Sequence, residues 1–97
     1  MPTKLPPIHP GETLLEDCMK PRGLSANRLA RELGIPASRV LEIVNGRRAI
    51  TADTALRLAR YFDTSAQLWM GLQTEYDLRV AERAVGTTIR RDVRVSA

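Results

Sequence analysis

The sequence contains very little of the chemistry on which enzymes, metal sites and disulfide scaffolds depend. Its 97 residues include a single cysteine, Cys18, and a single histidine, His9. One thiol cannot close an internal disulfide, which suits a reducing compartment, and two such side chains are too few for a metal site. Neither a glycine-rich phosphate loop nor a plausible catalytic triad is present. We therefore expect a protein that is not an enzyme and that binds no metal or cofactor.

Long apolar runs and aromatic residues are also scarce. No stretch of about 18 apolar residues could span a membrane, and residues 1–11, MPTKLPPIHPG, lack the apolar core of a signal peptide. We expect a cytoplasmic protein with no membrane partner. Only 4% of the residues are aromatic, so Leu, Ala, Ile and Val must supply the core of one small helical domain.

Positive charge is concentrated in one part of the chain. Lys and Arg total 15 against 11 Asp and Glu, which gives a net charge of +4. Residues 20–48 carry seven of the cations and only two acids, whereas residues 1–19 and 49–78 are each net acidic. A basic segment makes a polyanionic partner plausible but does not establish one.

The segment 25–45, SANRLARELGIPASRVLEIVN, predicts two short helices joined by a tight turn. Ser25 is a good N-cap, and Gly34 supplies the left-handed residue that ends a helix at low cost. Pro36 suits the start of the second helix. The inward stripe of that helix would be formed by Val40, Ile43 and Val44. The pattern fits a helix-turn-helix, with an ordinary helical hairpin as the alternative; the tight turn and the basic neighbours favour DNA binding.

The second of these helices should lie in the major groove of DNA with its N-terminal residues foremost. Arg39 is the first choice for base recognition, because a guanidinium can bind N7 and O6 of guanine together. Ala37 could touch a thymine methyl, and Glu42 could accept a hydrogen bond from cytosine. The predicted DNA-contacting residues, several of them for phosphates, are Asn27, Arg28, Ala37, Ser38, Arg39, Glu42, Asn45, Arg47 and Arg48. The candidates at the two ends of the motif could instead be solvated surface residues; they are Asn27, Arg28, Asn45, Arg47 and Arg48.

Further helices are predicted around this motif. One would begin near Pro10 and close at Gly23, and another would begin after the N-cap Thr51. A last helix would begin at Thr64, which matches a capping box with Gln67. Its apolar stripe includes three residues that would serve as core or as a dimer interface, Trp69, Leu72 and Tyr76.

The ends of the chain differ from its middle. We divide the sequence into a flexible N-terminal arm (1–8), a helix-turn-helix domain (9–86) and a C-terminal tail (87–97). In the tail, β-branched residues at a period of two predict a short strand. One strand is not stable alone, so it would pair with another chain; a disordered basic tail is the alternative.

Three segments carry a family resemblance that is more specific than a bare helix-turn-helix. They are HPGETL (9–14), VNGRRAITADTALRLARYF (44–62) and TSAQLWMGLQTEYDLRVA (64–81). On these segments the chain resembles the HigA (VapI-type) antitoxins, a branch of the Xre/Cro-like helix-turn-helix proteins. The resemblance implies an all-α, five-helix domain that forms a homodimer. It also implies a palindromic operator DNA, repression of the protein's own operon, and neutralisation of a HigB-like toxin, a RelE-like mRNA endonuclease.

Acidic residues before the basic segment suggest where such a toxin would bind. Glu12, Glu16 and Asp17 could complement the charge of a basic partner, although a solvated helix face explains them equally well. A stand-alone repressor of the same fold, without a toxin partner, is the alternative function.

Overall fold

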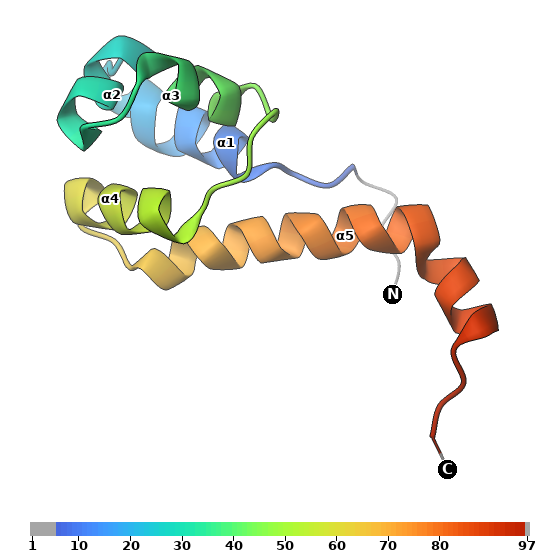
Figure 1. Ribbon diagram of the computed structural model, residues 1–97. Helices are drawn as coiled ribbons and strands as arrows, with labels where there is room; N and C mark the ends of the chain where they lie inside the picture. The colour runs from blue at the N-terminus through green and yellow to red at the C-terminus, as the bar shows by residue number, and fades with distance from the viewer. Residues whose placement is uncertain (1–5, 97) are drawn as a thin grey trace.

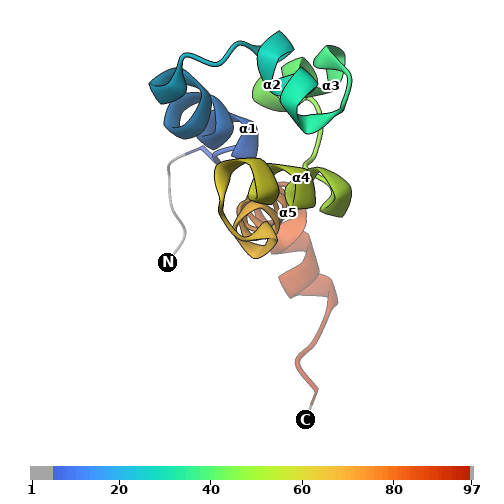
Figure 2. The same ribbon diagram turned by 90° about the vertical axis from the view of Figure 1, so that its left-hand side faces the viewer.

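The computed structural model describes residues 6–96, so most of the predicted N-terminal arm (1–8) lies outside the described residues. The described chain is all helical apart from its connections, which confirms the predicted five-helix, all-α fold. Its helices are α1 (Pro10–Thr13), α2 (Ala26–Leu33), α3 (Ala37–Val44), α4 (Ala52–Phe62) and α5 (Ala66–Asp92). Figure 1 shows α1, α2 and α3 on one side of the molecule, above α4 and the first part of α5, and Figure 2 shows the same layers from the end.

The first helix changes its winding along its length. α1 continues as a π-helical segment, η1 (Leu14–Met19), and then as a 3-10 turn, η2 (Lys20–Arg22). Gly23 ends the run in the left-handed region, with φ of 63°, as predicted. Gly23 is well suited to this conformation because it has no Cβ.

The core lies where α1 to α4 and the start of α5 meet. Leu29, Ala55 and Leu58 are fully buried, and Trp69 is 1% exposed. The Trp69 indole Nε1 donates to the hydroxyl of Thr64 over 2.9 Å. Trp69 is therefore a core residue, whereas Leu72 and Tyr76, which were predicted with it, are only half-buried.

The start of α5 differs from the predicted capping box. Ser65, not Thr64, is the N-cap, and its Oγ accepts from the Leu68 amide over 3.1 Å. Thr64 lies outside the helix, where its hydroxyl accepts from the indole of Trp69 instead of capping the backbone. The prediction of a Thr64–Gln67 box is therefore wrong by one residue.

The C-terminal part of α5 replaces the predicted strand. The helix runs to Asp92 and residues 93–96 form no strand, so the domain boundary placed at 86 falls inside a helix and the strand prediction is wrong for residues 87–96. A helix satisfies its own backbone hydrogen bonds, whereas a strand would need a partner, so an established helix extends more readily. Side-chain contacts of Arg90 with Glu82 and Thr87 run along this part of the helix. Figure 1 shows that it projects beyond the other helices.

Among residues 6–96, no helix combines the length and the apolar character needed to cross a membrane.

Candidate nucleic-acid interface

The helix-turn-helix forms where the sequence predicts it. Ser25 caps α2, with its Oγ accepting from the Arg28 amide over 3.1 Å. Gly34 ends α2 in the left-handed region at φ of 71°, and Pro36 is the N-cap of α3. Ile35, between them, is 9% exposed and anchors the turn in the core. Local signals alone account for both ends of α2, because Ser25 and Gly34 each bond within a few residues of themselves.

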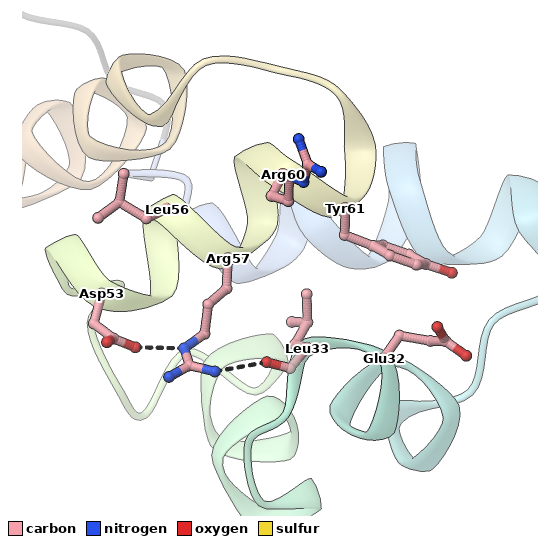
Figure 3. Close-up of a pocket in the computed structure, with 7 residues that line it drawn as sticks. All are labelled: Glu32, Leu33, Asp53, Leu56, Arg57, Arg60 and Tyr61. Carbon is pink, nitrogen blue, oxygen red and sulfur yellow. Dashed lines mark hydrogen bonds and ion pairs between the residues drawn. The ribbon is translucent and has the colours of Figure 1, made fainter.

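An arginine from α4 fixes the turn of the motif. Arg57 donates through Nη1 to the carbonyl of Leu33 over 2.9 Å, and its Nε lies 2.7 Å from Oδ1 of Asp53 (Figure 3). The guanidinium therefore satisfies a carbonyl at the C-terminus of α2, which has no partner inside its own helix. The sequence does not reveal this role, because only the Asp53–Arg57 spacing of four residues is visible locally.

Most of the predicted DNA-contacting residues of α3 lie on one exposed side of it. Val40 and Ile43 are each 1% exposed and attach α3 to the core. Ser38 and Asn45 are exposed, and Arg39 and Glu42 are half-exposed on the flanks of the same surface. Ala37 is half-buried and packs against the core. Asn27 and Arg28 are exposed in the first turn of α2.

Leu41 is a residue of α3 that sequence analysis missed. Its side chain is 46% exposed, and it is not among the apolar residues that pack on the core. It follows Ser38 by three residues and precedes Asn45 by four, so these three lie along one edge of the helix. That spacing is visible in the sequence, but a leucine in a short helix is ordinarily expected to face inward.

Three of the predicted contact residues, Arg28, Glu42 and Arg48, already hold ion pairs. Glu42 Oε1 lies 3.1 Å from Arg48 Nη2, and Arg28 Nε lies 3.0 Å from Glu32 Oε1. All four side chains are more than a third exposed. Pairs of this kind contribute about 0–1 kcal/mol. Both arginines can therefore exchange a carboxylate for a DNA phosphate at small cost.

The loop that carries Arg47 and Arg48 is held from two sides. The Arg47 amide donates to the carbonyl of Glu42 over 2.8 Å, which folds the loop against the end of α3. From α5, Gln73 Oε1 accepts from the Ile50 amide over 2.8 Å. Gln73 is 4% exposed, so this bond is shielded from water.

His9 also contacts the loop that carries Arg47 and Arg48. Its ring lies next to Gly46 and meets the ring of Tyr76 edge to face, with centroids 4.9 Å apart. Its Nδ1 accepts from the Gly11 amide over 2.9 Å and so caps α1. Burial lowers the pKa of His9 below its ordinary value of 6.5, and a hydrogen bond with the backbone of Arg48 only partly opposes this.

The acidic residues predicted for toxin binding lie in the first helical run. Glu12 and Asp17 are exposed, and Glu16 is exposed but pairs with Lys20, with Oε1 and Nζ 2.8 Å apart. Burial raises the pKa of the nearby Cys18 thiol, so that side chain is neutral at ordinary pH. Within residues 6–96, His, Cys, Asp and Glu side chains do not gather into a group of three that could hold a metal ion.

Comparisons with known proteins place the chain in a family. A family model described as helix-turn-helix matches residues 15–69. Virulence-associated protein I of Dichelobacter nodosus is 56% identical over 80 residues, which cover 82% of this chain and 74% of that protein.

Solved structures give the same assignment. The structure of Pseudomonas aeruginosa antitoxin HigA with the higBA promoter has a TM-score of 0.92 and 46% identity, covering 94% of this chain and 99% of that one. An addiction module antidote protein of the HigA family from Coxiella burnetii has a TM-score of 0.91 and 47% identity, covering 95% and 100%. The chain belongs to the HigA family of helix-turn-helix antitoxins.

Proposed function

We propose that this protein binds a palindromic operator as a dimer, represses its own operon, and neutralises a HigB-like toxin by direct contact. The proposed DNA binding is supported by the exposed edge of α3, which is followed by the basic loop with Arg47 and Arg48. The HigA of Pseudomonas aeruginosa, with 46% identity over most of the chain, has been solved with the higBA promoter. A stand-alone repressor without a toxin is the second candidate.

Base recognition and phosphate binding are divided between different residues. Arg39, in the first turn of α3, would read a guanine edge, and Ser38 next to it would contact a base or a phosphate. We expect Arg39→Ala to cost about 1–3 kcal/mol of binding free energy and to relax one base position. Fluorescence anisotropy on an operator and its single-base variants measures both effects. Equal losses on every variant would assign Arg39 to a phosphate instead.

Phosphate binding fits the loop after α3 and the start of α2. We expect the double variant Arg47→Ala, Arg48→Ala to weaken binding to all sequences alike. The slope of log K against log salt concentration should become shallower by about 0.9 for each phosphate that is no longer neutralised. A salt titration with the wild type and the double variant tests this, and an unchanged slope would contradict it.

The exposed apolar side of distal α5 supports a dimer. Leu78, Val85 and Ile89 are 62%, 43% and 49% exposed and follow one another at spacings of seven and four residues. Such a stripe is typical of a helix that packs on a second helix. A two-fold dimer predicts half-sites about 34–36 Å apart, or a multiple of that distance. Val85→Glu should give a monomer in analytical ultracentrifugation, and a dimer that survives this change would place the interface elsewhere.

Toxin binding is assigned to the acidic side of the first helical run. Ribosome-dependent nucleases must approach RNA, which favours a basic surface that Glu12, Glu16 and Asp17 would complement. Replacing the three acids with lysine should weaken the complex. Each acid is also replaced singly, and Asp92→Lys, at the far end of α5, is the matched control for one charge reversal. Toxin binding that is as strong in every single variant of the first helical run as in Asp92→Lys would contradict this assignment.

Co-purification decides between the two candidate functions. The chain is expressed with a tagged copy of the protein encoded next to it, and the pair is tested for a stable complex, growth rescue and binding to the upstream DNA. A complex with growth rescue supports the antitoxin. DNA binding without any such complex supports the stand-alone repressor.

A further inference from the structure

An exposed leucine on the proposed DNA-reading helix lies outside the hydrophobic core of the protein. Leu41 is 46% exposed, while the other large apolar residues of α3 are buried or pack on the core. Its neighbours on the same edge, Ser38 and Asn45, are exposed and polar. The exposed apolar residues of distal α5 belong to a different surface, for which a second copy of the chain is the proposed partner.

The major groove offers one apolar group to such a side chain. Base edges there present hydrogen-bond donors and acceptors, and only thymine adds a methyl group, at C5. A leucine gains from that methyl but leaves the polar edges of other bases without a partner. Ala37, the residue first considered for this contact, is half-buried against the core and presents less surface.

We propose that Leu41 contacts a thymine methyl in the operator and thereby specifies an A·T pair at that position. The proposal rests on the proposed DNA binding by α3. Consecutive residues of a helix are about 100° apart, so Arg39 and Leu41 project to opposite edges of the exposed side of α3. The two residues therefore read different base pairs, and their effects on sequence preference should be separable.

Replacement of thymine by deoxyuridine tests the contact, because it removes the methyl and keeps every hydrogen-bonding group. The operator is first located by footprinting of the upstream DNA with the full-length protein. Each thymine is then replaced in turn, symmetrically in both half-sites, and binding is measured by fluorescence anisotropy. For the wild type we expect one position where the loss is about fourfold per half-site, which corresponds to about 0.8 kcal/mol for one buried methyl group.

Leu41→Ala should remove the effect of the methyl at that one position and leave the other positions unchanged. The variant should also bind the thymine operator more weakly than the wild type, but bind the deoxyuridine operator as tightly as the wild type does. Leu56→Ala is the control, because Leu56 is 63% exposed on α4 and lies outside α3. Circular dichroism melting confirms that both variants are folded.

Two outcomes would overturn the proposal in different ways. Equal deoxyuridine effects in the wild type and in Leu41→Ala at every thymine would refute the contact while leaving DNA binding by α3 intact. Failure of the wild type to bind any part of the upstream DNA specifically would refute the proposed function, and the role of Leu41 with it.

Discussion

Gly11 is the position where one added methyl group should disturb this fold most. A Cβ built on Gly11 would lie 1.7 Å from the carbonyl oxygen of Ile43, 2.6 Å from its carbonyl carbon and 2.9 Å from Cα of Val44. All three are backbone atoms of α3, so no side-chain rotation relieves the clash. Since Cβ contacts under 3.0 Å are essentially never observed, α1 and α3 must separate by more than an ångström.

The expected cost follows from that displacement. Overpacking a core costs typically 1–3 kcal/mol, and a clash with backbone belongs at the upper end, so we expect Gly11→Ala to lose about 3 kcal/mol. In a domain of this size such a loss lowers Tm by roughly 12–24 °C. Because α3 carries the predicted DNA-contacting residues, the variant should also bind operator DNA more weakly at temperatures where it remains folded.

Gly71 provides the matched control. It lies in α5, is exposed, and an added Cβ would meet no atom within 4 Å. Gly71→Ala should therefore stabilise the protein by about 0.5–1 kcal/mol through helix propensity. Thermal melting by circular dichroism compares the two variants with the wild type. A Gly11→Ala protein that melts within about 2 °C of the wild type would refute the argument, because it would show that α1 does not approach α3 so closely.

Three further predictions concern polar contacts around the motif. Gln73→Leu leaves the buried amide of Ile50 without an acceptor and should cost about 1–3 kcal/mol in urea unfolding; an unchanged midpoint would contradict this. Arg57→Ala should cost about 1 kcal/mol in thermal melting, since its bond to Leu33 is only partly buried and therefore partly screened by water, and Arg57→Lys should rescue little because lysine lacks the planar fork. Protonation of His9 favours the unfolded chain, because the folded pKa is the lower one. The contribution of neutral His9 to the free energy of unfolding should be complete above about pH 6.5 and decline as the pH falls toward the folded pKa. His9→Asn can still cap α1 and should remove this pH dependence from the urea unfolding midpoint.

The sequence by itself determined the parts of the protein that depend on near neighbours. Ser25 and Gly34 fix the two ends of α2, because each bonds to backbone groups within four residues, and Pro36 lies at the start of α3. The inward positions Val40 and Ile43 follow from helical spacing alone. The family resemblance was also readable, because it lies in contiguous segments of the chain.

Tertiary structure decided the features in which distant segments compete or meet. Arg57 donates to a carbonyl 24 residues away, and Gln73 accepts from an amide 23 residues away. Gly11 lies against the backbone of α3. No local sequence pattern encodes these partners. The first part of the alternating tail, up to Asp92, is helical because the free energy of a strand depends on a partner, which the sequence of one chain does not supply. The exposure of Leu41 likewise depends on which side of α3 the other helices cover. Local sequence sets where helices begin and end, whereas only packing sets which of their surfaces remain available for a ligand.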